Sequence, residues 1–249
     1  MLRVAFVAIF LSFYVLILGP PLLLYTFVTK HVDPLYWAGV KGVMFFVNCV
    51  GVHVDVKGAE RIPPGTCIFA ANHTSSADAP AVVGAIPRRI AILLKRPLFD
   101  WPIVGQAFHL AHFIPVDRFN RESAIESVDK AVIALKAGQS FLIYPEGTRS
   151  PDGRLQDFKK GTAVMAIQSG VPVVPVACSG AHRVMEKRKL NIHPGRILVE
   201  FLEPVNPQQY TMEQREALIQ EIHDRVAAGL PQDQRPLVNG PVWNDGALG

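Results

Sequence analysis

The segment Asn72-His73-Thr74-Ser75-Ser76-Ala77-Asp78 holds a histidine and an aspartate five residues apart. In a regular helix, residues i and i+5 lie well apart around the cylinder, whereas residues i and i+3 or i+4 are neighbours. A bend is therefore needed to bring the two side chains together. If they meet, the Asp78 carboxylate can accept a hydrogen bond from one ring nitrogen of His73, which leaves the other nitrogen to take a proton from a hydroxyl group. The spacing thus predicts a general base with its orienting partner.

The residues around this pair predict how it is positioned. The apolar stretch 67–71 is typical of a buried strand, and Ser75-Ser76 before Ala77-Asp78 is typical of the start of a helix. We expect His73 where the strand ends and Asp78 in the first turn of the helix. The chain contains no complete G-x-S-x-G nucleophile elbow. The nucleophile is therefore expected to be the hydroxyl of the substrate itself.

Two other interpretations fit the same segment. Taken alone, the pair is also consistent with a turn histidine and a helix-capping acid. Asn72-His73-Thr74 also matches the N-glycosylation sequon, which requires an accessible loop in a secreted protein. The apolar strand that precedes the sequon argues against this second interpretation.

A second motif, Tyr144-Pro145-Glu146-Gly147-Thr148-Arg149-Ser150, directly follows a predicted strand. Proline ends a strand and glycine permits a tight turn, so a carboxylate and a guanidinium are expected to project from the carboxyl end of that strand. Open α/β sheets bind their ligands at this edge. The alternative is a surface turn with an internal Glu–Arg pair.

Three further stretches could contribute to a site. Phe113-Ile114-Pro115-Val116-Asp117-Arg118 carries a predicted strand out to an arginine, and a guanidinium suits a phosphate monoester. Lys159 and Lys160 add two cations at a predicted helix start, where they meet either phosphate or water. The stretch 171–176 has the composition of a buried strand interrupted by prolines, which fits an edge, a bulge or the wall of an apolar groove.

From residue 53 onward, short apolar strands alternate with helical stretches, which predicts an α/β domain. Strands are expected at 53–57, 66–71, 90–94, 112–116, 141–144, 173–177 and 197–202, and helices near 77–85, 101–109, 121–137, 159–168 and 212–228. We expect three regions: a membrane-binding helical segment at 1–52, a catalytic domain at 53–230 and a polar tail at 231–249.

The first region explains the mean hydropathy of +0.23, because residues 4–28 carry no charged side chain. Gly19-Pro20-Pro21 interrupts this stretch after 15 largely apolar residues, which are too few for a straight span of a bilayer. The segment is either one kinked transmembrane helix or the first arm of a helical hairpin that enters one leaflet, with 35–52 as its second arm. The hairpin is favoured. A cleaved signal peptide is disfavoured, because only Arg3 precedes the apolar stretch and no small-x-small site follows it.

Charge and cysteine content indicate which partners the protein binds and which compartment it faces. The net charge of +4 and the pI near 9.0, without a nucleic-acid-binding motif, favour an anionic membrane and anionic substrates over nucleic acid. Three cysteines, Cys49, Cys67 and Cys178, lie far apart among apolar residues, which is typical of reduced thiols facing the cytosol. The histidines lack companion ligands at a useful spacing, so no metal is expected.

Taken together and in their order along the chain, four of these motifs resemble the sequence blocks of the glycerolipid acyltransferase family, most closely those of the 1-acylglycerol-3-phosphate acyltransferases. The blocks are carried by Asn72, His73 and Asp78; by Phe113, Ile114 and Arg118; by Pro145, Glu146, Gly147, Thr148, Arg149 and Ser150, with Tyr144 in place of the usual Phe; and by Val171, Pro172 and Pro175. The resemblance implies a mixed, largely parallel central sheet flanked by helices, with an N-terminal apolar helical hairpin, as in glycerol-3-phosphate acyltransferases.

The resemblance also implies an activity. A fatty acyl group would pass from acyl-CoA or acyl carrier protein to the sn-2 hydroxyl of lysophosphatidic acid, making phosphatidic acid for phospholipid biosynthesis without a cofactor. His73 and Asp78 would be catalytic, and the substrate-binding residues would be Arg118, Glu146, Gly147, Thr148, Arg149 and Lys159. The enzyme would be associated with membrane lipids, with its active site on the cytoplasmic side, and in a bacterium with the inner membrane.

Three alternatives remain open from the sequence. The acceptor could be glycerol 3-phosphate, another lysophospholipid or a lyso-aminolipid. The chain could be a lipid-binding module in which His73 and Asp78 are structural. It could also be a lipid hydrolase, for which water is the acceptor.

Overall fold

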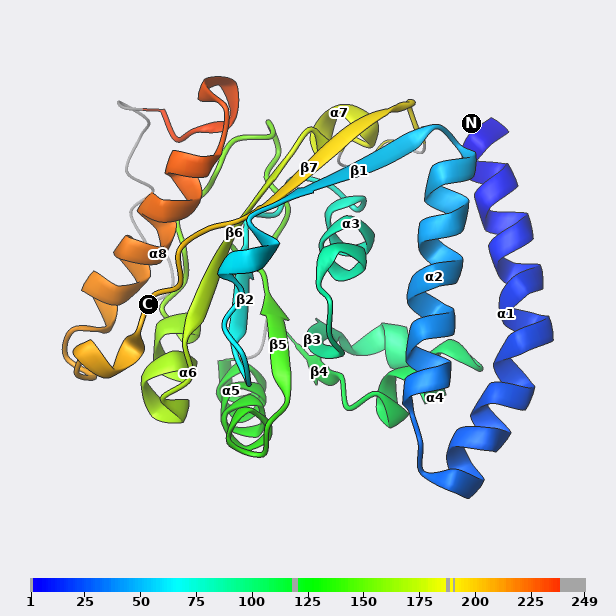
Figure 1. The fold of residues 1–249 in the computed structure, drawn as a ribbon, viewed down its shortest axis with the longest axis horizontal. Helices are drawn as coiled ribbons and strands as arrows, with labels where there is room; N and C mark the ends of the chain where they lie inside the picture. Colours follow the sequence, from blue (N-terminus) through cyan, green and yellow to red (C-terminus); the bar gives the residue numbers. More distant parts are fainter. Residues whose placement is uncertain (1, 118–120, 187–188, 190, 238–249) are drawn as a thin grey trace.

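The computed structural model describes residues 2–117, 121–186, 189 and 191–237, and a seven-stranded sheet forms its centre (Figure 1). The strand order is β1-β7-β6-β2-β5-β3-β4, and every neighbouring pair is parallel except β6 and β7. The strands are β1 (Val52–Lys57), β2 (Ile68–Ala71), β3 (Ile90–Lys95), β4 (Ile114–Val116), β5 (Ser140–Ile143), β6 (Val173–Ser179) and β7 (Gly195–Phe201). The predicted mixed, largely parallel sheet is confirmed.

Helices cover both faces of this sheet (Figure 1). They are α1 (Leu2–Thr29), α2 (Asp33–Cys49), α3 (Asp78–Ala85), α4 (Val104–Leu110), α5 (Arg121–Lys136), α6 (Gly161–Ser169), α7 (Ala181–Val184) and α8 (Arg215–Gly229), with single 3₁₀ turns at Ala59–Arg61, Arg96–Asp100, Pro207–Gln209 and Gln232–Gln234. The short α7 was not predicted, because four residues are too few to show a helical period.

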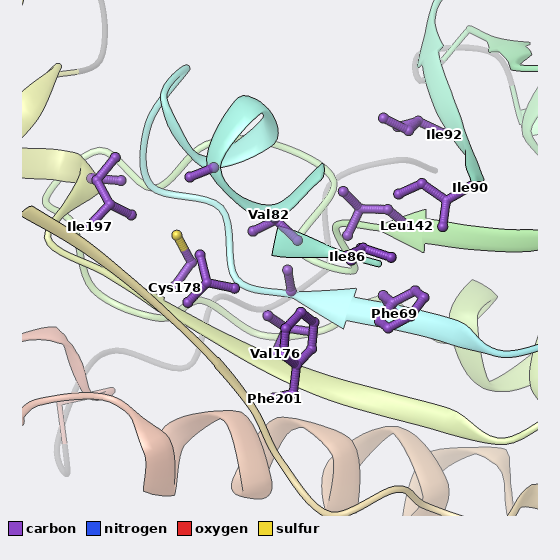
Figure 2. Close-up of a cluster of buried hydrophobic side chains, with 14 of the residues drawn as sticks. Phe69, Val82, Ile86, Ile90, Ile92, Leu142, Val176, Cys178, Ile197 and Phe201 are labelled. Carbon is purple, nitrogen blue, oxygen red and sulfur yellow. The ribbon is translucent and has the colours of Figure 1, made fainter. Parts of the chain in front are cut away.

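Successive side chains of a strand point to opposite faces of the sheet, so the buried side chains form one cluster on each face. Phe69 of β2 is fully buried and shares a cluster with Val82 of α3 and with Ile86, the residue that follows this helix (Figure 2). Its neighbour Ile68 points to the opposite face and belongs to a second cluster with residues of α5, α6 and α8. Each such buried side chain contributes about 2 kcal/mol of burial free energy. Packing on both faces therefore fixes the position of β2. It also fixes where the chain leaves the carboxyl end of this strand.

Strand β6 lies inside the sheet, between β2 and β7, so the prolines of 171–176 do not mark an edge. Pro175 pairs with Ala70 in the register of β2 and β6, and its carbonyl accepts a hydrogen bond from the Leu202 N–H at 2.9 Å. The nitrogen and carbonyl of one strand residue point the same way, so the missing N–H faces the end of β7. No hydrogen bond to β2 is lost, which is why a central strand tolerates this proline.

The N-terminal segment forms a hairpin of two helices, α1 and α2, that run antiparallel (Figure 1). The expected interruption at Pro20-Pro21 is wrong, since α1 continues through both prolines. Proline has a helix-compatible φ and removes only its own hydrogen bond to the preceding turn, so the helix bends rather than ends. The Tyr14 hydroxyl donates to the Ala38 carbonyl at 3.0 Å and joins the two arms. Among the described helices, α1 alone has the length and apolar composition to cross a membrane.

The segment after α8 packs against the catalytic domain as far as the structure describes it. The Leu155 N–H donates to the carbonyl of the buried Gln234 at 2.8 Å. The first part of the predicted polar tail, residues 231–237, thus contacts the rest of the chain through Gln234. Residues 238–249 of that predicted tail lie outside the described residues.

Candidate active site

The structure brings His73 and Asp78 together as their spacing predicts. His73 lies two residues after the end of β2, and Asp78 is the first residue of α3. The ring Nδ1 of His73 lies 3.0 Å from Asp78 Oδ2. The Asp78 side chain is fully buried, whereas the His73 side chain is 14% exposed. This leaves Nε2 as the ring nitrogen that can meet a substrate.

The loop between them fixes the aspartate. Asp78 Oδ2 also accepts the main-chain N–H groups of Thr74 at 2.6 Å and Ser75 at 2.7 Å. Three donors on one oxygen set the orientation of the carboxylate before any substrate binds. Because they donate to Asp78, these two main-chain N–H groups are already used within the protein. We therefore do not assign them to an oxyanion hole.

A buried bridge ties the end of β2 to β6. The Asn72 side chain donates to the Cys178 carbonyl at 2.9 Å and accepts the Cys178 N–H at 2.7 Å. The Cys178 thiol lies 3.7 Å from Asp78 Oδ1. Burial, followed by the charge of Asp78, raises the pKa of this thiol well above its usual value, so it remains a protonated donor. Sequence reasoning assigned Cys178 no role, because about 100 residues separate it from its partners.

The loop that follows β5 supplies the other wall of the site. The Tyr144 ring stacks on the His73 imidazole, with ring centroids 4.2 Å apart and planes inclined by 26°. The Tyr144 hydroxyl is buried and has no hydrogen-bond partner among the described residues. Burial raises the pKa of this phenol well above its usual value, and the nearby Asp78 adds to the shift. The sequence showed only that a tyrosine stands where the family pattern has phenylalanine.

Glu146 points inward. It is 4% exposed, and its Oε1 accepts the main-chain N–H of His73 at 2.7 Å. Burial raises the pKa of this carboxyl to about 9, so it is neutral at pH 7; the hydrogen bond from His73 acts in the opposite direction. Ser150, from the same loop, donates its N–H to the His73 carbonyl at 2.7 Å.

Two cationic side chains flank the same loop. The Arg149 guanidinium donates to Ser76 Oγ at 2.5 Å, between His73 and Asp78 in the chain. Gly147 has a φ of +74°, and a Cβ on it would lie 3.1 Å from Lys159 Nζ, so the lysine packs directly over the turn. Thr148 is exposed on this turn. The structure thus brings Arg149, Gly147 and Lys159 to one edge of the site.

Two of the expected cations are not placed in this group. Arg118 lies outside the described residues. Lys160 forms an ion pair with Glu216 of α8 at 2.5 Å, so it serves the packing of two helices.

An apolar cavity of about 470 Å³ lies between the helical hairpin and the catalytic domain. Its wall on α3 begins with Ala79, the residue after Asp78, and continues with Pro80 and Val83. Ile103 closes against Gly19 of α1, where a Cβ would overlap the isoleucine side chain. The remaining lining comes mainly from α1, α2, β3 and α4, including Tyr14, Leu18, Tyr36, Ile92, Trp101 and Phe108. Its size is that of a ligand pocket, and its lining is that of a hydrocarbon site.

The described residues contain no group of three His, Cys, Asp or Glu side chains that could hold a metal ion. The site combines a histidine base and a buried carboxylate with neighbouring cations and an apolar cavity.

Known proteins with this arrangement point to one family. The family model described as Acyltransferase matches residues 53–179. The chain is 35% identical over 188 residues to the 1-acyl-sn-glycerol-3-phosphate acyltransferase of Limnanthes alba, covering 75% of this chain and 66% of the relative. It is 34% identical to the enzyme of the same name from Limnanthes douglasii, covering 82% and 72%. The crystal structure of the 1-acyl-sn-glycerophosphate acyltransferase from Thermotoga maritima superposes with a TM-score of 0.77 at 28% identity and 92% coverage of both chains. With its histidine and aspartate in one hydrogen-bonded pair on this fold, the chain belongs to the acyltransferase family and is similar to the 1-acyl-sn-glycerol-3-phosphate acyltransferases.

Proposed function

We propose that this enzyme transfers a fatty acyl group from an acyl thioester, either acyl-CoA or acyl carrier protein, to the sn-2 hydroxyl of 1-acylglycerol 3-phosphate. The product would be phosphatidic acid. The observation that carries the proposal is the His73–Asp78 pair, which leaves Nε2 of the ring without a hydrogen-bond partner among the described residues and lies beside Arg149 and Lys159. The names of the relatives support the same acceptor.

The pair acts as a general base and then as a general acid. Nε2 of His73 removes the proton of the acceptor hydroxyl while its oxygen attacks the thioester carbonyl. Asp78 keeps Nδ1 protonated and stabilises the imidazolium that forms. When the tetrahedral intermediate collapses, the carbon–sulfur bond breaks and His73 returns its proton to the leaving thiolate. The products are the new ester and a free thiol, so no acyl-enzyme and no cofactor are required.

The acceptor phosphate binds at the cations beside the pair. Arg149 can offer two parallel N–H donors to a phosphate, and Lys159 adds a point charge next to Gly147. Thr148 is exposed between them and can donate its hydroxyl. Arg118, which lies two positions after β4 in the sequence and outside the described residues, remains a proposed third cation.

The acyl chain of one substrate lies in the apolar cavity. Because the cavity wall starts one residue after Asp78, a chain that enters it leaves its polar end near the catalytic pair. Each methylene removed from water in this way contributes about 0.8 kcal/mol.

The hairpin holds the catalytic domain at a membrane. Large apolar side chains are exposed along α1, including Leu2, Ile9, Phe13, Leu16, Leu24 and Phe27. Such a surface is typical of contact with lipid. The acceptor and product are amphiphiles that stay in the bilayer, whereas the thioester comes from the cytosol. We therefore propose that the site lies on the cytoplasmic side, at the inner membrane in a bacterium.

A transfer assay tests the proposal. Purified protein in detergent receives labelled oleoyl-CoA and lysophosphatidic acid, and phosphatidic acid and free thiol are measured together. His73→Ala is expected to lose at least about 100-fold in rate, as for a removed general base, whereas His53→Ala, an exposed histidine on β1, retains activity.

Other outcomes separate the alternatives. Turnover only with glycerol 3-phosphate, another lysophospholipid or a lyso-aminolipid would keep the chemistry and overturn the acceptor. Free fatty acid without diacyl product would indicate a hydrolase. No thiol release from acyl-CoA or acyl carrier protein with any acceptor would indicate a lipid-binding module.

A further inference from the structure

Glu146 belongs to the block that the resemblance assigns to substrate binding, but its side chain contacts the catalytic histidine instead. It follows β5 by three residues and is 4% exposed. Its Oε1 accepts the His73 N–H at 2.7 Å. Its other oxygen, Oε2, is sealed from solvent and makes no well-aligned hydrogen bond with a described residue, although Gln156 lies near enough to lower the pKa of the carboxyl. A substrate outside the fold cannot reach a sealed oxygen unless the loop moves.

The contact is one of three that a single loop makes with His73. Ser150 donates its N–H to the His73 carbonyl at 2.7 Å, and the Tyr144 ring stacks on the imidazole. Residues 144–150 thus hold both main-chain polar groups and the ring of the histidine. If the carboxyl of Glu146 were removed, the buried N–H of His73 would lose its acceptor, which is unfavourable and which the loop could relieve by shifting.

We propose that Glu146 is a positioning residue that holds the main chain of His73 in its catalytic place, and that it does not bind the acceptor. This inference rests on the proposed function, in which His73 is the base. It gives neighbouring side chains different roles. Glu146 faces the histidine, whereas Arg149 of the same turn and Lys159, which packs over it, face the acceptor. Burial supports this division, because a neutral carboxyl carries no charge with which to recognise a ligand.

The proposal predicts a particular division between kcat and KM. A positioning residue changes the geometry of the base and hence kcat, whereas a ligand of the acceptor changes KM. Glu146→Gln keeps the size and an oxygen acceptor, whereas Glu146→Met keeps only the size. We expect the Gln variant to stay within about threefold of the wild type in both constants. A misplacement of the reacting group by about 1 Å costs about 100-fold, so the Met variant is expected to lose 50-fold or more in kcat with an unchanged KM for lysophosphatidic acid.

Arg149→Ala provides the comparison, since it is expected to raise the acceptor KM. A tenfold or larger rise of the acceptor KM in either Glu146 variant, with kcat retained, would overturn the proposal. If the Met variant fails to fold, the Gln variant decides: unchanged constants support positioning, and a raised KM indicates a ligand.

Hydrogen–deuterium exchange of the peptide that contains His73 tests the contact without any turnover. Its amide is expected to be protected in the wild type and in Glu146→Gln, and to exchange at least tenfold faster in Glu146→Met. Equal protection in all three would contradict the inference. A wild type with the expected protection but no activity on any acceptor would reject the proposed function and leave the contact established.

Discussion

The Tyr144 ring lies over the His73 imidazole at a centroid distance of 4.2 Å, and its buried hydroxyl has no hydrogen-bond partner among the described residues. The ring therefore limits rotation of the catalytic side chain, while the hydroxyl contributes only the cost of burying a polar group. Packing of the Tyr144 ring thus favours the folded protein, whereas burial of its unpaired hydroxyl disfavours it.

Tyr144→Phe is accordingly expected to stabilise the protein and to keep its activity. Removing an unpaired buried hydroxyl should contribute about 1 kcal/mol, which corresponds to a rise of roughly 2–4 °C in Tm for a chain of this size. Thermal melts and transfer assays of the two proteins side by side measure both effects. A lower Tm, or a tenfold loss of rate, would mean that the hydroxyl binds a group in the working enzyme.

Asp78→Asn is expected to lower kcat by about 100- to 10,000-fold, because an amide keeps the hydrogen bonds of the loop but not the charge that stabilises the imidazolium. The matched control is Asp129→Asn, an exposed residue of α5, which should leave kcat unchanged. A loss smaller than tenfold in Asp78→Asn would show that this carboxylate is structural.

The stability of the protein should depend on pH through Glu146. The pKa of its carboxyl is about 9 in the folded protein and near 4.5 in the unfolded chain. Between these values the unfolded chain has lost the proton and the folded protein keeps it, so stability falls as pH rises, by up to about 1.4 kcal/mol per pH unit.

Glu146→Gln removes this slope. Its Tm should exceed that of the wild type clearly at pH 8, and the difference should shrink as pH falls toward 5. Melts at both pH values, with the exposed Glu60→Gln as control, measure the effect. A difference in Tm that does not vary with pH would show that Glu146 is ionised in the folded protein.

The apolar cavity should set the preference for acyl chain length. Val83→Phe fills its wall on α3 and should favour shorter chains, whereas Ile103→Ala opens the contact with α1 and should favour longer ones. Each methylene gained or lost is worth about 0.8 kcal/mol, or roughly fourfold in relative kcat/KM.

A series of acyl-CoA lengths measures this preference, with Ile133→Ala, an exposed isoleucine on α5, as control. Unchanged preferences in both cavity variants would place the acyl chain elsewhere.

The sequence by itself determined the chemical pair and the architecture. The composition of 67–71 and the Ser-Ser step before Asp78 are local signals, so they predicted the strand, the bend and the helix that join His73 to Asp78. Short apolar runs likewise predicted the seven strands, and apolar residues at three- and four-residue steps predicted the longer helices, because both signals depend on near neighbours in the chain.

Only the tertiary structure decided what surrounds that pair. Glu146, Tyr144 and Cys178 reach His73 and Asp78 across 71 to 100 residues of chain, through the order of β2, β5 and β6 in the sheet. The tertiary structure also shows that α1 continues through Pro20-Pro21, with α2 and α4 in contact with it. Sequence spacing records which residues are close along the chain, and the roles in this site depend on which are close in space.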